Sequence, residues 1–235
     1  MFVIIRKKDL LLGAALFLTL GIYLSLTMLG PSVSVFSYRS EEDRTIVVDA
    51  GHGGEDGGAV SADGVVESHI NLAIAKDVDV LLTFLGEKTL MTRTEDISIH
   101  SQGAETLHQK KASDLKNRVE LVNTSPNAIL LSIHQNSLPT ARSVRGAQVF
   151  YGKNESSDVY ANSMQNALNH AINEKEKDAK AISSSVYLMK NVTAPAVLVE
   201  CGFLSNGADT ELLQQENYQK KLAVVIVAGF LDAEI

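Results

Sequence analysis

Four side chains of this sequence could together bind a metal ion and move a proton. They are two imidazoles and two carboxylates, widely separated along the chain: His52, Glu67, His134 and Glu200. A catalytic zinc ion takes three nitrogen or oxygen ligands from the protein and keeps a fourth position open. His52, Glu67 and His134 would supply such a set, which leaves Glu200 beside the metal as a general base. The pattern therefore predicts a metal-dependent hydrolase.

This grouping depends on the elements that carry the four residues. Three of the residues follow short apolar runs that are typical of buried strands, namely residues 45–49, 128–133 and 196–199. The other, Glu67, opens an amphipathic segment. Because the carboxyl ends of parallel strands share one edge of a sheet, where ligands bind, we expect these side chains to converge there.

Taken one at a time, each residue also has an ordinary explanation. His52 could be only a turn residue in a glycine-rich loop, and Glu67 only an acid favoured in the first turn of a helix. Glu200 could be a solvated acid at a strand end. However, an acid that directly follows an apolar run is drawn toward the interior, where a carboxylate usually has a charged partner. The joint occurrence favours a metal site.

Other polar residues near the strand ends are harder to assign. Arg93 and Asn136 could orient a substrate, although a surface ion pair and loop hydrogen bonding would also explain them. Cys201 is interpreted as a small buried residue rather than a nucleophile. The remaining histidines are interpreted as surface or structural residues: His69, His100, His108 and His170.

The order of the predicted elements indicates an α/β domain. Apolar residues at helical spacing predict four helices, over 68–86, 115–122, 157–173 and 217–231. Short apolar runs predict six strands, over 45–49, 88–92, 128–133, 146–151, 186–189 and 196–199. Residues 94–112 are polar and irregular, and we expect a loop there. This alternation favours a three-layer sandwich with a mostly parallel central sheet flanked by helices.

The N-terminal segment predicts a hydrophobic helix that anchors the chain in a membrane. Residues 10–29 carry no charge, and a helix of that length spans about 30 Å, the thickness of the hydrocarbon layer. Three basic residues precede it, so the N-terminus is expected in the cytoplasm and the rest outside. Cleavage of a signal peptide, which would give a secreted protein, is the alternative. The expected organisation is a signal anchor over 1–30, a linker over 31–44 and a catalytic domain over 45–235.

The composition excludes several other classes of protein. Hydrophobic residues make up 45% of the chain, which rules out low-complexity disorder, and one cysteine cannot form a disulfide scaffold. The formal net charge is −7, and the basic residues near the N-terminus leave the remainder more acidic still. Binding to nucleic acid needs a basic stripe and is therefore not expected.

Four motifs, in order along the chain, resemble a known family. They are IVVDAGHGGEDGGAV, the pair Glu67-x-x-x-Asn71, SIHQN and AVLVECGFLSN. Together they resemble the zinc-dependent N-acetylmuramoyl-L-alanine amidases of the amidase-3 type, over residues 45–233. The stretches GAQVFY, SVYLMK and YQKKLAVVIVAGFL are similar to the spore-cortex and germination (CwlD-like) branch.

The resemblance implies one Zn²⁺ per chain, held by His52, Glu67 and His134, with Glu200 as the catalytic residue. It implies hydrolysis of the amide bond between the lactyl group of N-acetylmuramic acid and L-Ala in peptidoglycan, in spore cortex maturation or germination. Some relatives need an activator protein, and such a partner is left open here. Two alternatives also stay open: a zinc peptidase acting on the stem peptide, and an inactive wall-binding domain.

Overall fold

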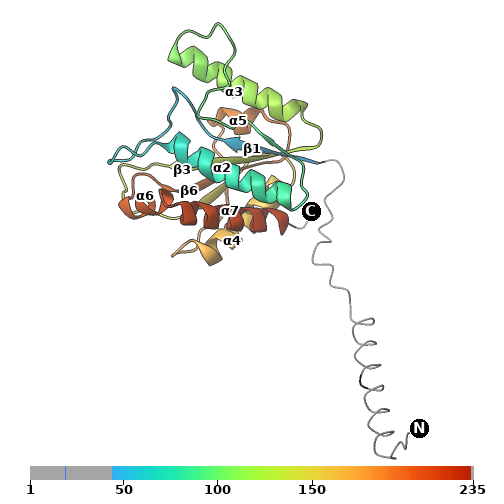
Figure 1. Cartoon of the computed structure of the whole chain (residues 1–235), viewed down its shortest axis with the longest axis vertical. Helices are drawn as coiled ribbons and strands as arrows, with labels where there is room; N and C mark the ends of the chain where they lie inside the picture. The colour runs from blue at the N-terminus through green and yellow to red at the C-terminus, as the bar shows by residue number, and fades with distance from the viewer. Residues whose placement is uncertain (1–18, 20–43, 234–235) are drawn as a thin grey trace, which may run out of the picture. The chain divides into compact units, whose positions relative to one another are not determined.

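A six-stranded sheet forms the centre of the structure, a computed structural model that describes residue 19 and residues 44–233 (Figure 1). Its strands, in spatial order, are β2 (Thr89–Met91), β1 (Thr45–Ala50), β3 (Ala128–Asn136), β6 (Ala196–Phe203), β4 (Gln148–Tyr151) and β5 (Lys180–Ala181). Strands β4 and β6 pair antiparallel, and the other neighbours pair parallel. The predicted mostly parallel sheet is confirmed.

Helices cover both faces of this sheet. The helices on one face are α2 (Glu67–Phe84), α4 (Ser157–Ala171) and α7 (Glu216–Leu231), and those on the other are α3 (Leu107–Thr124) and α5 (Tyr187–Asn191) (Figure 1). The short helix α6 (Gly207–Leu213) follows β6. The layers of helix, sheet and helix confirm the expected sandwich.

Apolar side chains fill both helix–sheet interfaces. On the α2 face, Ile74 and Leu131 are fully buried, and the rings of Tyr160 and Phe230 stack with centroids 4.8 Å apart. On the α3 face, the smaller cluster includes Val47. Burying a side chain of this size stabilises a fold by roughly 1.5–3 kcal/mol, so the strands that carry the polar site are held by their own core.

The strand register brings the predicted site residues to neighbouring positions. In the β3–β6 ladder His134 lies opposite Glu200, with a bulge directly after His134. Strand β3 runs on to Asn136, three residues beyond its predicted end, so His134 lies within a strand rather than after one. A strand residue has its backbone fixed by two neighbours, which leaves its imidazole little freedom.

Two expectations about the elements are wrong. Residues 186–189 do not form a strand, because Leu188 and Met189 pack in the α3-side core as part of the one-turn helix α5. The polar segment 94–112 does not stay irregular to its end, because α3 begins at Leu107. Its start is fixed by a capping box, in which Thr106 and Gln109 each bond the other's backbone.

Apart from residue 19, the predicted anchor over residues 10–29 lies outside the described residues, and so does the predicted linker except for Arg44. Strand β1 begins directly after Arg44, whose guanidinium pairs with buried Glu87 at 2.7 Å. Within the part of the chain that the structure describes, no helix combines the length and the apolar character needed to cross a membrane.

Candidate metal centre

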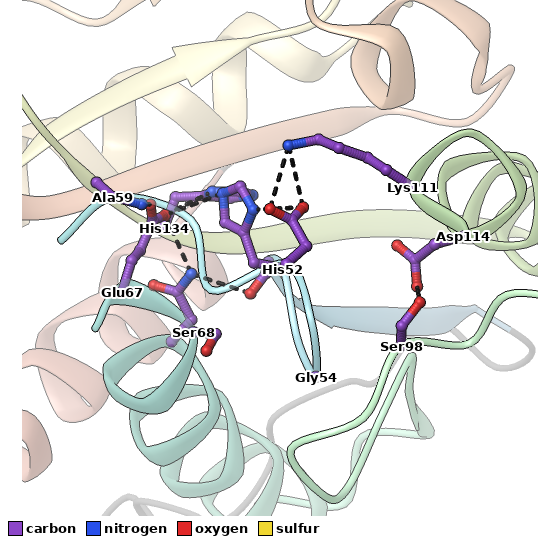
Figure 2. Close-up of polar contacts among 12 residues, drawn as sticks. His52, Gly54, Ala59, Glu67, Ser68, Ser98, Lys111, Asp114 and His134 are labelled. Carbon is purple, nitrogen blue, oxygen red and sulfur yellow. Dashed lines mark hydrogen bonds and ion pairs between the residues drawn. The ribbon is translucent and has the colours of Figure 1, made fainter. Parts of the chain in front are cut away.

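His52, Glu67 and His134 converge on one point at the carboxyl edge of the sheet (Figure 2). Each offers one ligand atom, and these atoms lie within 4.8 Å of one another. Glu67 Oε1 is 3.4 Å from His52 Nε2 and 3.0 Å from His134 Nδ1. Tetrahedral zinc with bonds of about 2.0–2.1 Å separates its ligand atoms by about 3.3 Å. Two imidazoles and one carboxylate at this spacing fit a zinc ion.

The glycine-rich loop after β1 aims the His52 ring. His52 has a positive φ of 62°, a conformation that an ordinary side chain adopts only when its surroundings hold it there. Those surroundings are an Arg118 guanidinium that donates to its carbonyl at 2.7 Å and an Asp56 carboxylate 2.9 Å from Nδ1. With Nδ1 occupied, Nε2 is the nitrogen that faces Glu67.

The carboxylate of Glu67 is equally constrained. Its residue opens α2, and its Oε2 accepts a hydrogen bond from the backbone N–H of Ala59 at 2.8 Å. Its Oε1 accepts from the N–H of Gln135 and from the side-chain amide of Asn71, both at 3.1 Å. Asn71 is the second residue of the Glu67-x-x-x-Asn71 motif. The motif therefore places a hydrogen-bond donor to the carboxylate one helical turn after Glu67.

Glu67 and His52 shift each other's pKa values. Burial acts to raise the pKa of Glu67, but His134 and His52 outweigh it and hold that pKa well below its usual range. Burial acts to lower the pKa of His52, but hydrogen bonds to Asp56 and Glu67 outweigh it and raise that pKa to about 9. The site therefore concentrates negative charge, which attracts either a proton or a metal cation.

Glu200 lies in the same cleft but outside the three-ligand set. The cleft has a volume of about 270 Å³ and is lined by His52, His134 and Glu200, together with Lys111 and Tyr187 from the α3 and α5 side. Among the residues the structure describes, Glu200 Oε2 is buried without a hydrogen-bond partner. Burial raises the pKa of Glu200 to about 7. A carboxyl group of that pKa can both accept and return a proton near neutral pH.

The other residues singled out in the sequence, Arg93, Asn136 and Cys201, do not belong to the metal-binding set. Arg93 is buried, and its guanidinium donates to the backbone carbonyls of Ala50, Gly51, Ser68 and Glu95. Asn136 lines a neighbouring cavity of about 530 Å³, and its side chain accepts from the Ser137 N–H at 2.8 Å. Cys201 is buried and free, as expected. Arg93 thus holds the site's loop, whereas Asn136 borders space that a substrate could enter.

Sequence reasoning missed the residues that support the ligands. Asp49, in β1, pairs with Arg118 of α3 in a buried ion pair at 2.5 Å. Burial acts to raise the pKa of Asp49, but Arg118, His134 and a hydrogen bond from Ser132 together outweigh it and lower that pKa to about 2. Asp56 stands four residues after His52, and an acid that close to a predicted ligand is the signal that could have identified it.

Comparison with known proteins gives a consistent result. Residues 46–232 match the Amidase_3 family, described as N-acetylmuramoyl-L-alanine amidase. The germination-specific N-acetylmuramoyl-L-alanine amidase of Bacillus subtilis is 36% identical over 188 residues, which cover 80% of this chain and 78% of the relative.

Solved structures agree with this match. The CwlD amidase from Clostridioides difficile, in complex with the GerS lipoprotein, is 37% identical with a TM-score of 0.74, covering 79% of this chain and 95% of that one. The catalytic domain of CwlV from Bacillus (Paenibacillus) polymyxa var. colistinus is 28% identical with a TM-score of 0.67, covering 81% and 99%. The chain therefore belongs to the N-acetylmuramoyl-L-alanine amidase family, and within it is similar to the germination-specific, CwlD-like members.

Proposed function

We propose that this chain is a zinc-dependent amidase of peptidoglycan. It hydrolyses the amide bond between the lactyl group of N-acetylmuramic acid and L-Ala, in spore cortex maturation or germination. The observation that carries the proposal is the convergence of His52, Glu67 and His134 in the cleft that Glu200 also lines, where a buried Glu200 oxygen has no hydrogen-bond partner among the described residues. The germination-specific relative in Bacillus subtilis supports the assignment to spores.

His52, Glu67 and His134 would hold the zinc ion. When bound, zinc supplies Lewis-acid chemistry that polarises a carbonyl oxygen and makes water easier to deprotonate. Glu200 accepts a proton from the attacking water, whose oxygen bonds to the lactyl carbonyl carbon. The bond from that carbon to the L-Ala nitrogen then breaks, and Glu200 returns its proton to the nitrogen. The products are a lactyl carboxylate on the glycan and a stem peptide with a free amino end.

Metal analysis combined with mass spectrometry of digested peptidoglycan tests this proposal. The expected result is one zinc per chain and release of intact stem peptides that begin with L-Ala. Stem peptides cleaved within their length would identify a zinc peptidase instead. A wall-binding domain without activity would sediment with peptidoglycan and release no peptide.

We further propose that an accessory protein regulates this activity. The supporting observation is that the similar CwlD amidase was solved in complex with the GerS lipoprotein. The test compares turnover by the purified chain alone with turnover after addition of an extract from sporulating cells. If the purified chain alone turns over peptidoglycan as fast as it does with the extract, the need for an activator is excluded.

We also propose that the chain is anchored in the membrane with its N-terminus in the cytoplasm and its catalytic domain outside. The uncharged run over residues 10–29 and the basic residues before it support this. Protease added to intact cells should digest the domain while the chain remains in the membrane fraction. Recovery of the domain in the medium would indicate cleavage and secretion.

A further inference from the structure

A chain of polar contacts joins the ligand His52 to helix α3. The His52 Nδ1 lies 2.9 Å from Asp56 Oδ2, and the same Asp56 carboxylate is also held by Lys111 of α3. The Lys111 amine lies 3.1 Å from Asp56 Oδ2 and 3.2 Å from Oδ1. Figure 2 shows Lys111 reaching from its helix toward the His52 side of the site.

Helix α3 also holds His52 through its backbone. Arg118, two helical turns after Lys111, donates to the His52 carbonyl at 2.7 Å. One helix thus contacts both the backbone and, through Asp56, the ring of the same residue. An imidazole that donates its second N–H to a carboxylate has its tautomer and its orientation toward a metal fixed.

We propose that Asp56 is a positioning residue for the metal ligand His52 and that Lys111 of α3 holds Asp56 in place. This inference rests on the proposed zinc site, and it adds a residue that acts through His52 without touching the metal. Lys111 and Asp56 both line the cleft, so this pair forms part of the cleft wall.

The chain provides a matched control beside this contact. Glu55 and Lys110 are the sequence neighbours of Asp56 and Lys111, and they form an ion pair of their own at 2.6 Å. Glu55 is more than half exposed, and its carboxylate is paired with Lys110 rather than with His52. The two pairs join the same loop to the same helix, so they differ chiefly in whether a ligand is contacted.

The experiment measures zinc affinity of the full chain by competition with a chromophoric chelator. Asp56→Asn should bind zinc about 10–100-fold more weakly, whereas Glu55→Gln should bind as tightly as the unaltered chain. The visible spectrum of the cobalt-substituted protein should shift in Asp56→Asn and stay the same in Glu55→Gln. A purely structural role for Asp56 would change the thermal unfolding of the metal-free Asp56→Asn chain without moving its cobalt bands.

Lys111→Met keeps Asp56 and removes only its ion pair with Lys111. It therefore tests whether Asp56 positions His52 even if Asp56→Asn fails to fold. It should weaken zinc binding by up to about five-fold, and Lys110→Met should have no effect. Equal affinities and spectra in all four variants and the unaltered chain would overturn the inference alone. Failure of the unaltered chain to bind zinc would refute the proposed function together with it.

Discussion

At the scale of single residues, the site depends on close approach between backbone and imidazole. Gly51 lies directly against the His134 ring, so a side chain at position 51 would have no space. The glycine is needed here for its missing Cβ rather than for an unusual φ angle. A ring packed against backbone on one side and hydrogen-bonded to Glu67 on the other has one available orientation.

Gly51→Ala should therefore impair the site without unfolding the domain. The added Cβ would lie 2.7 Å from His134 Nδ1, a distance that forces the ring to move. A displacement of about 1 Å at a catalytic group can cost about 100-fold in activity. Zinc content and peptide release should both fall, as measured by metal analysis and mass spectrometry. Gly207→Ala is the control, since its Cβ meets no atom within 4 Å, and equal activity of the two variants would contradict the prediction.

Glu200→Gln should separate metal binding from catalysis. The amide keeps the shape of the side chain but cannot take up and return a proton, so turnover should fall by about 10²–10⁴-fold. Zinc content should stay at the unaltered level, because Glu200 is not among the three converging ligands. Unchanged release of stem peptides would remove Glu200 from the mechanism.

The four central residues could be predicted from the sequence because each is tied to a recognisable element. His134 follows a mainly apolar run over 128–133, Glu200 follows an apolar run over 196–199, and Glu67 stands where an amphipathic helix begins. Arg118 could not be predicted in the same way. Its role comes from contacts of α3 with β1 and with the loop that follows β1, and the spacing of residues along the chain does not encode such contacts.

At the scale of elements, the sequence predicted only the second half of α3, the helix whose side chains hold both His52 and Asp56. Its residues are mainly polar, so apolar spacing gave only a weak signal over its second half. The buried face of α3 carries Arg118 and Asp114, which enter the interior as a paired network with Asp49. Apolar periodicity therefore underestimates the length of a helix whose buried contacts are partly ionic.

Arg118→Met should show that a buried ion pair holds α3 against the sheet. The substitution leaves Asp49 buried without its cation, and breaking a buried pair in this way costs about 3–5 kcal/mol. Equilibrium unfolding in urea should report that loss of stability. Lys110→Met, which removes an exposed pair on the same helix, should cost about 0–1 kcal/mol. A loss for Arg118→Met no larger than for Lys110→Met would contradict the prediction.

At the scale of the whole molecule, metal binding is coupled to folding through protons. In the metal-free chain the protonated form of His52 is stabilised, since its pKa is raised from 6.5 to about 9. That contribution is fully present below the unfolded pKa of 6.5 and is lost as the pH rises toward 9. Zinc requires neutral imidazole, so it must displace this proton before it can bind.

The stabilisation of the chain by zinc should consequently grow with pH. Between about pH 6 and about pH 8, zinc affinity should rise about ten-fold per unit for the one proton released by His52. At a fixed free zinc concentration, set by a chelator buffer, the increase in Tm over the metal-free chain should be larger at the higher pH. Thermal unfolding followed by circular dichroism measures both states. A zinc-induced increase in Tm that does not change with pH would show that the His52 proton and the metal do not compete for one site.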